Sequence, residues 1–458
     1  MKSSINLVFK KPKLYVLENR EYSIVLNTET GKRVLLNNKE ITLFRNTPFL
    51  KEINDDNDCV KLIFEQDSDL SRLIFKMLKK HVIHLWSAKH KNYIDFDAEC
   101  AAKHPPTDVF ITFGDECNLS CVYCYRDAGL CEKNDKPRDY DLQRLKELIE
   151  KVQLMGASTV TFTGGEPMLH SHIFLLGEYA KKLGLRTCML TNGTLISEDN
   201  AYMFACFDVV KISLDSIYPH INDMTRGAGT TEKILHGIRL LKRVGVYVTI
   251  ESVLTKINYK TIGDTIKSLY LNEKVDNYRA SHFIPTGRGS LNFTLSIPEE
   301  EIAECNKYVF NEVFGGFGNR PFKDFVKDAT IENGMQSTCG AGICELLITL
   351  TGDVYPCRSL QSEEYFLGNI FQETLDEIKS KKSFSDIRRA LNVEDNTECG
   401  ECPLKYLCAG GCRAAHAAMS GDLRKNNKTW CKLLKNMKHE SIWLGEGVHP
   451  YTGEKLTI

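Results

Sequence analysis

The sequence predicts an α/β fold in which a partial (β/α)6 barrel of the TIM type lies between a smaller N-terminal domain and a cysteine-rich C-terminal domain. Three observations lead to this prediction. Strand-like and helical segments alternate from about residue 107 to residue 290, short strands precede helices in the first 98 residues, and most later cysteines fall between Cys339 and Cys431. We expect domains at residues 1–98, 107–325 and 335–440, with a tail at 441–458.

The alternation in the middle of the chain predicts a parallel sheet, because right-handed crossovers return each strand beside the previous one. Six strands are expected, at Asp108–Phe113, Thr159–Thr163, Thr187–Thr191, Val209–Ser213, Val246–Val253 and Arg279–Ile284. Helices are expected between them, for example at Leu142–Leu154, His172–Lys182 and Glu232–Val244. Six such units make a partial barrel, whose active site should lie at the carboxyl ends of its strands.

The N-terminal segment predicts three short strands followed by helices. The strands are expected at Lys13–Leu17, Ser23–Leu26 and Arg33–Leu36, and a hairpin turn separates the last two. Helical spacing of apolar residues follows at Asn37–Asn46 and at Asp67–Lys80.

Composition excludes several kinds of partner. The 458 residues carry a formal net charge of -1, so no basic field attracts nucleic acid or an anionic membrane. No stretch approaches the roughly 20 apolar residues that span a bilayer, and the N-terminus lacks the apolar core of a secretory signal. We therefore expect a cytoplasmic protein without membrane or nucleic-acid partners. The cytosol keeps thiols reduced, so the 17 cysteines indicate metal or iron–sulfur ligation rather than disulfides.

One cysteine motif follows the first predicted barrel strand directly. It reads Cys117-Asn-Leu-Ser-Cys121-Val-Tyr-Cys124, and three thiolates at this spacing can bind three irons of a cubane. The fourth iron is then open. Thiolates suit iron because they are soft ligands that balance its charge. The alternative is a zinc site, but zinc usually takes four protein ligands in paired units.

This motif resembles that of the radical S-adenosylmethionine (SAM) superfamily, in which the open iron chelates SAM and the cluster cleaves it to a 5′-deoxyadenosyl radical. Three further motifs follow the next strands in the family's order: Gly164-Gly165-Glu166-Pro167, Thr191-Asn192-Gly193 and Ser213-Leu214-Asp215. Each is a weak signal alone, because similar runs are common in turns. The resemblance implies that SAM is contacted by Tyr123, Gly164, Gly165, Glu166, Asn192, Ser213, Asp215 and Arg226.

The C-terminal cysteines resemble the SPASM domain, which holds two auxiliary [4Fe–4S] clusters in its family. Gly352 lies between the cysteines at the family's spacing, and the run ends in a CX2CX5CX3C motif and a final cysteine. The resemblance implies one auxiliary cluster on Cys339, Cys357 and Cys412 with Cys344 as a candidate fourth ligand, and a second on Cys399, Cys402, Cys408 and Cys431. If Cys344 is not a ligand, one iron of the first cluster is open and can bind a substrate thiolate. With the SAM cluster, this makes three [4Fe–4S] clusters. The alternative is a double zinc ribbon. We expect metal sites, more than a core, to hold this region together.

The N-terminal strands and helices resemble the winged-helix RiPP recognition element, which binds the leader of a ribosomally made precursor peptide. The resemblance implies that a leader adds as a strand to Arg33–Leu36 and packs against the last helix. A structural appendage and a DNA-binding winged helix are the alternatives, and the near-neutral charge argues against the second.

Together these resemblances imply a radical SAM peptide maturase that installs a crosslink, with a thioether as the first expectation and flavodoxin or ferredoxin as electron donor. C–C or C–O crosslinking and epimerisation are alternatives. So is formylglycine formation of the anaerobic sulfatase-maturating type, although those enzymes carry Asp where this chain has Arg358. A non-enzymatic iron–sulfur regulator is a third alternative. The sequence singles out no general base, because Asp, Glu and Tyr candidates are many.

Overall fold

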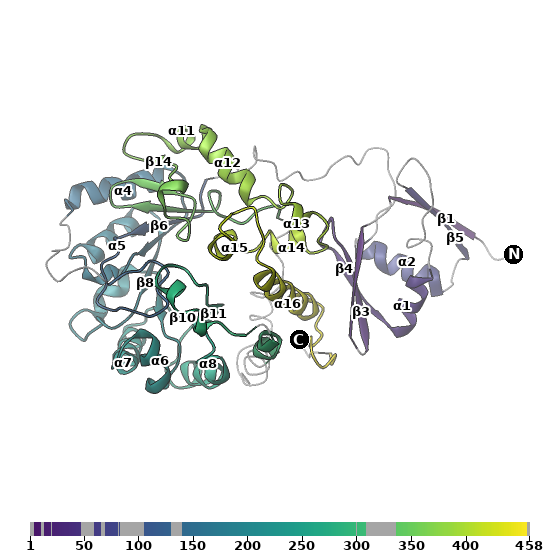
Figure 1. Ribbon diagram of the computed structural model, residues 1–458, viewed down its shortest axis with the longest axis horizontal. Helices are drawn as coiled ribbons and strands as arrows, with labels where there is room; N and C mark the ends of the chain where they lie inside the picture. The colour runs from purple at the N-terminus through teal and green to yellow at the C-terminus, as the bar shows by residue number, and fades with distance from the viewer. Residues whose placement is uncertain are drawn as a thin grey trace.

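The computed structural model describes residues 4–10, 13–19, 21–46, 59–65, 69–80, 82, 105–129, 140–298, 300–307 and 336–455. The strands and helices of the middle of the chain lie at one end of the molecule and the N-terminal strands at the other (Figure 1). Helices from the C-terminal region lie between them. The expected domain limits at residues 98 and 325 fall outside the described residues.

The six strands of the expected parallel sheet are present and lie side by side in chain order. They are β6 (Asp108–Thr112), β7 (Thr159–Thr163), β8 (Arg186–Thr191), β9 (Val209–Ser213), β10 (Val248–Leu254) and β11 (Asn277–His282). All five neighbouring pairs are parallel. Crossover helices connect them: α4 (Leu142–Leu154), α5 (Ile173–Lys182), α6 (Pro219–Arg226), α7 (Thr230–Arg243) and α8 (Ile262–Leu271).

Alternate residues of these strands have different surroundings. Val109 and Ile111 of β6 belong to the large apolar core that also includes α4, α5 and α7. Because successive side chains of a strand point to opposite faces, Asp108 and Phe110 lie on the other face of the sheet. The same alternation places Lys211 of β9 on that inner face. The sheet therefore has an apolar helix-covered face and an inner face that carries charged residues.

The C-terminal region extends the same sheet, which the sequence did not predict. β12 (Glu345–Thr349) pairs parallel with β6, and β13 (Asp353–Tyr355) and β14 (Gly368–Asn369) follow antiparallel, so the sheet has nine strands. Leu346, Ile348 and Val354 belong to the main apolar core, together with residues of helices α11 (Leu375–Ser380) and α12 (Lys382–Leu391). The expectation that metal sites more than a core hold this region is therefore wrong for these elements, because they share the core of the central sheet.

The remaining C-terminal helices carry Cys399, Cys408 and Cys431. They are α13 (Thr397–Gly400), α14 (Lys405–Cys408), α15 (Arg413–Ser420) and α16 (Lys428–Gly445). The last of these continues across residue 440, where the sequence predicted a boundary before a tail. Within the described residues, no helix is long and apolar enough to cross a membrane.

The N-terminal domain contains a three-stranded antiparallel sheet, β2 (Leu14–Glu18), β3 (Tyr22–Asn27) and β4 (Arg33–Asn37), in that order. Helix α1 (Asn38–Arg45) begins at a capping box in which Asn37 and Glu40 satisfy each other's backbone N–H groups. Helix α2 (Asp69–Lys79) follows β5 (Cys59–Glu65), which pairs antiparallel with β1 (Ser4–Lys10). The sequence did not predict β1 and β5.

Both faces of this N-terminal sheet are covered. Val25, Val34 and Leu36 pack with α1 and α2 on one face. Ile24 and Leu26 pack on the other face, in a cluster with Leu404 and Leu407 near α14 and Ile442 and Trp443 of α16. Arg33 also pairs with Glu446 over 2.9 Å, and both side chains are mostly buried. The N-terminal domain is therefore packed directly onto the helices that carry the last cysteines.

Candidate iron–sulfur and SAM site

The loop with Cys117, Cys121 and Cys124 follows β6, at the carboxyl edge of the parallel strands. The Cys124 N–H donates to the Cys121 carbonyl over 3.2 Å, which makes a tight turn. Two backbone N–H groups donate to thiols, Leu119 to Cys117 Sγ and Ala128 to Cys124 Sγ, each over 3.4 Å. N–H groups aimed at sulfur stabilise thiolates, so the loop suits the anionic ligands of an iron–sulfur cluster.

The thiols of this loop are partly buried. Burial raises the pKa of Cys117 to about 11 and also raises the pKa of Cys121. Without metal these thiols keep their protons at neutral pH, and metal binding must displace them. Among the residues with described positions, no three His, Cys, Asp or Glu side chains could hold one shared metal ion. A cubane makes no such demand, because each thiolate binds its own iron.

Gly164 and Gly165 bring the turn after β7 against the cluster loop. The Gly165 N–H donates to the Gly114 carbonyl and the Glu166 N–H to the Glu116 carbonyl, both over 2.8 Å. A Cβ at Gly165 would overlap the Glu116 carbonyl, and Gly164 has φ +150. Only glycine allows this approach, so the two glycines tie the second strand end to the cluster loop.

Glu166 is buried at the ends of β7 and β8. Its Oε1 accepts from Thr191 Oγ1 over 2.8 Å and from the Met168 N–H over 3.1 Å, while Oε2 accepts from the Asn192 N–H over 2.7 Å. Burial raises the pKa of Glu166 to about 7, against the lowering effect of these bonds. Asn192 also donates through Nδ2 to Cys117 Sγ over 3.8 Å. Glu166 and Asn192, both predicted from sequence, therefore lie together beside the cluster loop.

Tyr123, Asp215 and Arg226 are also together, but they bind one another. Arg226 Nε and Nη2 donate to Asp215 Oδ2 and Oδ1 over 2.9 and 3.0 Å, and the Tyr123 hydroxyl donates to Asp215 Oδ2. Burial alone lowers the pKa of Arg226, but the adjacent Asp215 carboxylate raises it overall. Ser213 ends β9, two residues before Asp215, and is half-buried. The structure thus places these residues at the predicted edge, with the polar groups of Asp215 and Arg226 directed at each other.

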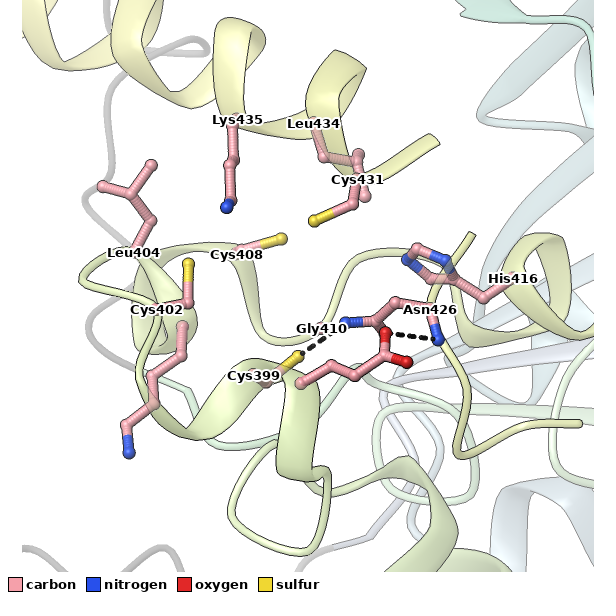
Figure 2. A pocket seen from close by; sticks show the side chains of 12 residues that line it. Cys399, Cys402, Leu404, Cys408, Gly410, His416, Asn426, Cys431, Leu434 and Lys435 are labelled. Atoms are coloured by element: carbon pink, nitrogen blue, oxygen red, sulfur yellow. Dashed lines mark hydrogen bonds between the residues drawn. The ribbon is translucent and has the colours of Figure 1, made fainter. Parts of the chain in front are cut away.

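The second auxiliary cysteine set lines one pocket. Figure 2 shows the thiols of Cys399, Cys402, Cys408 and Cys431 facing a common space. Asn426 Nδ2 donates to Cys399 Sγ over 3.4 Å, and the Lys435 side chain also points into this space. Four soft thiol ligands around one pocket, with donors aimed at sulfur, fit a [4Fe–4S] cluster.

The first auxiliary set is less complete. Cys339 and Cys357 pack against a small apolar cluster that includes Leu360 and Leu391. Burial raises the pKa of Cys357 to about 12, and the nearby Glu345, Cys412 and Cys339 groups add to this rise.

Cys344 is the exposed member of the predicted ligands. Its N–H donates to the Gly340 carbonyl over 2.8 Å, in the turn before β12. The structure thus brings Cys339, Cys357 and Cys412 into one neighbourhood, and the ligand role of Cys344 stays a prediction.

Sequence reasoning missed several polar residues that support the site. Asn118 Oδ1 accepts from Asn192 Nδ2 over 2.8 Å, and Asn118 Nδ2 donates to Thr194 Oγ1 over 2.9 Å. Asn426 was also missed. Asn118 lies inside the CX3C spacer, where the motif leaves the residue type open, so only its position between Cys117 and Cys121 could have drawn attention to it.

Comparison with known families agrees with this geometry. Residues 111–269 match the radical SAM superfamily, and residues 339–403 match the iron–sulfur cluster-binding SPASM domain. The chain is therefore a radical SAM enzyme.

More particularly, it is a radical SAM enzyme related to peptide-modifying maturases of the SPASM type. The antilisterial bacteriocin subtilosin biosynthesis protein AlbA of Bacillus subtilis is 26% identical over 324 residues, covering 69% of each chain. The AdoMet-dependent heme synthase of Oleidesulfovibrio alaskensis is 29% identical over 328 residues, covering 67% of this chain and 82% of its own. The structure of Streptococcus suis SuiB bound to precursor peptide SuiA has a TM-score of 0.55 at 17% identity, covering 91% of this chain and 99% of that one.

Proposed function

We propose that the protein is a maturase of ribosomally made peptides that uses a SAM-derived radical to install a crosslink. The observation that carries this proposal is the open edge of β4. β4 ends the order β2-β3-β4, and among the described residues no further strand covers it. An open strand edge is the surface to which an extended peptide adds by main-chain hydrogen bonds. Helix α2 lies beside the same strand and can contact side chains of the added segment.

The hydrogen bonds between β3 and β4 determine which groups of β4 face this edge. The Asn27 N–H donates to the Lys32 carbonyl over 2.8 Å, so residues 27 and 32 form a hydrogen-bonded pair. Hydrogen-bonded and non-hydrogen-bonded pairs alternate along antiparallel strands. Leu35, opposite Ile24, is therefore in a non-hydrogen-bonded pair. Its N–H and C=O point to the open edge, where a leader strand would bind them.

The outward direction of the Leu35 N–H allows a test of the proposed leader site. Leu35→Pro removes an outward N–H without removing a bond to β3. We expect affinity for the precursor peptide to fall about tenfold, which corresponds to about 1.4 kcal/mol and is within the range for one hydrogen bond. Leu35→Ala keeps the N–H and controls for the lost side chain. Fluorescence anisotropy with a labelled peptide encoded beside this chain measures both. Equal affinities for the two variants would contradict the assignment.

The proposed cofactors are SAM and three [4Fe–4S] clusters. Cys117, Cys121 and Cys124 would hold the SAM cluster, and the other eight predicted cysteines two auxiliary [4Fe–4S] clusters. When bound and reduced, the SAM cluster supplies the electron that releases the 5′-deoxyadenosyl radical. Glu166 would accept a hydrogen bond from the SAM amine, and Asn192, which donates to Glu166, would orient the Glu166 carboxylate. The buried Asp215–Arg226 pair holds the strand end beside them.

The bond formed is proposed to be a thioether from a cysteine sulfur of the peptide to carbon, with C–C or C–O crosslinks and epimerisation as alternatives. Formylglycine formation is less well supported, because Arg358 occupies the position of the expected Asp. Anaerobic reaction with SAM, reductant and the precursor peptide, followed by mass spectrometry, tests this. A thioether removes two hydrogens and one alkylatable thiol, whereas epimerisation leaves the mass unchanged. SAM cleavage without peptide binding would instead favour a small-molecule substrate.

A further inference from the structure

Arg358 follows directly on Cys357, a proposed ligand of the first auxiliary cluster, and its side chain lies on the inner face of the central sheet. The guanidinium Cζ lies 5.3 Å from the ring centroid of Phe110, which β6 presents to that face. The Arg358 N–H donates to Glu345 Oε1 over 3.3 Å, at the start of β12. Backbone and side chain are therefore both held, the first by β12 and the second by an aromatic ring.

This position lies between two of the proposed cluster sites. Arg358 acts electrostatically on Tyr125, the residue after Cys124, and on Cys412, another ligand of the first auxiliary cluster. The loops also touch directly, because Arg126 Nη1 donates to Gln361 Oε1 over 2.6 Å.

The guanidinium of Arg358 keeps its charge without a close counter-ion. Among the described residues it has no ion pair within 4 Å and no side-chain hydrogen bond, and it lies over the aromatic ring of Phe110. The carboxyl groups of Glu251 on β10, Glu345 and Asp108 on β6 interact with it electrostatically, and Lys211 of β9 lies near the last two. Arginine stays protonated throughout the working pH range. In a partly buried site such a charge acts over several ångströms.

From this arrangement we infer that Arg358 is a positioning residue that raises the reduction potential of the first auxiliary cluster. A fixed positive charge favours the more negative, reduced state of a nearby cluster, and net charge around a cluster is one of the determinants of its potential. The inference rests on the auxiliary cluster proposed above. The Arg358 charge would make the cluster a better electron acceptor during peptide modification.

The test is a redox titration followed by electron paramagnetic resonance. Replacing Cys117, Cys121 and Cys124 by Ala leaves only the auxiliary clusters, so two midpoints are observed. We expect Arg358→Gln to shift one midpoint to lower potential and to leave the other in place, which makes the second cluster an internal control. Arg358→Lys keeps the charge and should keep both midpoints. Arg389→Gln changes an exposed arginine on α12 and should also leave both unchanged.

The outcomes distinguish a failure of the role inferred for Arg358 from a failure of the cluster assignment on which it rests. If Arg358→Gln fails to hold iron, Arg358→Met preserves the contact with Phe110 and carries the same expectation. The proposed role of Arg358 is wrong if a variant with a neutral residue at this position holds its full iron content and both midpoint potentials are unchanged. It is also wrong if both midpoint potentials shift equally. Neither result contradicts the cluster assignment. A parent protein with iron for only one auxiliary cluster overturns the cluster assignment itself.

Discussion

The buried ion pair between Asp215 and Arg226 offers a direct test of the site. Asp215 is 2% exposed and Arg226 6% exposed, and two charge-assisted hydrogen bonds join them. Asp215 Oδ1 also accepts from the Val253 N–H over 2.9 Å, which ties β9 to β10. The perturbation is Asp215→Asn, which keeps the shape of the side chain but removes its charge.

The expected magnitude follows from burial. Removing one partner of a buried pair leaves the other charge without compensation, at a cost of about 3–5 kcal/mol. Arg226→Gln should cost a similar amount by the same reasoning. In the double variant no charge is left unpaired. Its loss of unfolding free energy should therefore be about 2 kcal/mol smaller than the sum of the losses in the two single variants. The exposed pair of Arg243 with Glu198 is a control, and Arg243→Gln should cost less than about 1 kcal/mol.

The assay must report on this part of the chain, because unfolding of a protein with several domains is not a single transition. Hydrogen exchange along a urea series, read by mass spectrometry on peptides from β9 and α6, gives the local free energy of unfolding. The four members of the cycle are compared as cluster-loaded protein under anaerobic conditions. Additivity of the two single losses within about 0.5 kcal/mol would refute the reasoning, because uncoupled residues cannot form the pair.

Three further predictions follow from the site. Gly165→Ala should lose the iron of the SAM cluster, because its Cβ would overlap the Glu116 carbonyl, whereas Gly400→Ala should keep full iron, since its Cβ meets nothing within 4 Å. The pKa of Glu166 is about 7, so its carboxylate is increasingly protonated below that pH. SAM affinity by anaerobic equilibrium dialysis should fall from about pH 8 to about pH 6 more steeply in the parent than in Glu166→Gln. Complete reconstitution should give about twelve irons per chain. Cys344→Ser should give the oxidised protein a new electron paramagnetic resonance signal from a three-iron cluster. An unchanged signal would exclude Cys344 as a ligand.

The sequence predicted the central strands within a few residues because burial there leaves a strong pattern. Thr159–Thr163 and Val209–Ser213 match β7 and β9, and Leu142–Leu154 matches α4. Each segment alternates or repeats its apolar residues with the period of its element, so local information is sufficient. The cysteine spacings were equally informative, since ligand geometry restricts them.

Long-range pairing was beyond the reach of such patterns. β12 joins β6 across more than two hundred residues, and β1 pairs with β5 across about fifty, with no local signal for either register. α16 was also missed, although Trp430, Leu433, Leu434 and Met437 follow helical spacing. The mutual bonding of Asp215 and Arg226 was missed for another reason: a family motif indicates that residues are near a ligand, but not which partner satisfies them.

The packing of the N-terminal sheet against α14 and α16 bears on how such enzymes can be re-engineered. Exchanging the N-terminal domain, the proposed leader-binding module, between maturases is a route to new substrates that treats this domain as separable from the rest of the chain. Here a transplanted sheet would meet Leu404, Leu407, Ile442 and Trp443, the apolar side chains that pack against the present one. A chimera that keeps only the cysteine-bearing half would expose that apolar surface to water beside the proposed second auxiliary cluster. Successful exchanges should therefore transfer the N-terminal sheet together with α16.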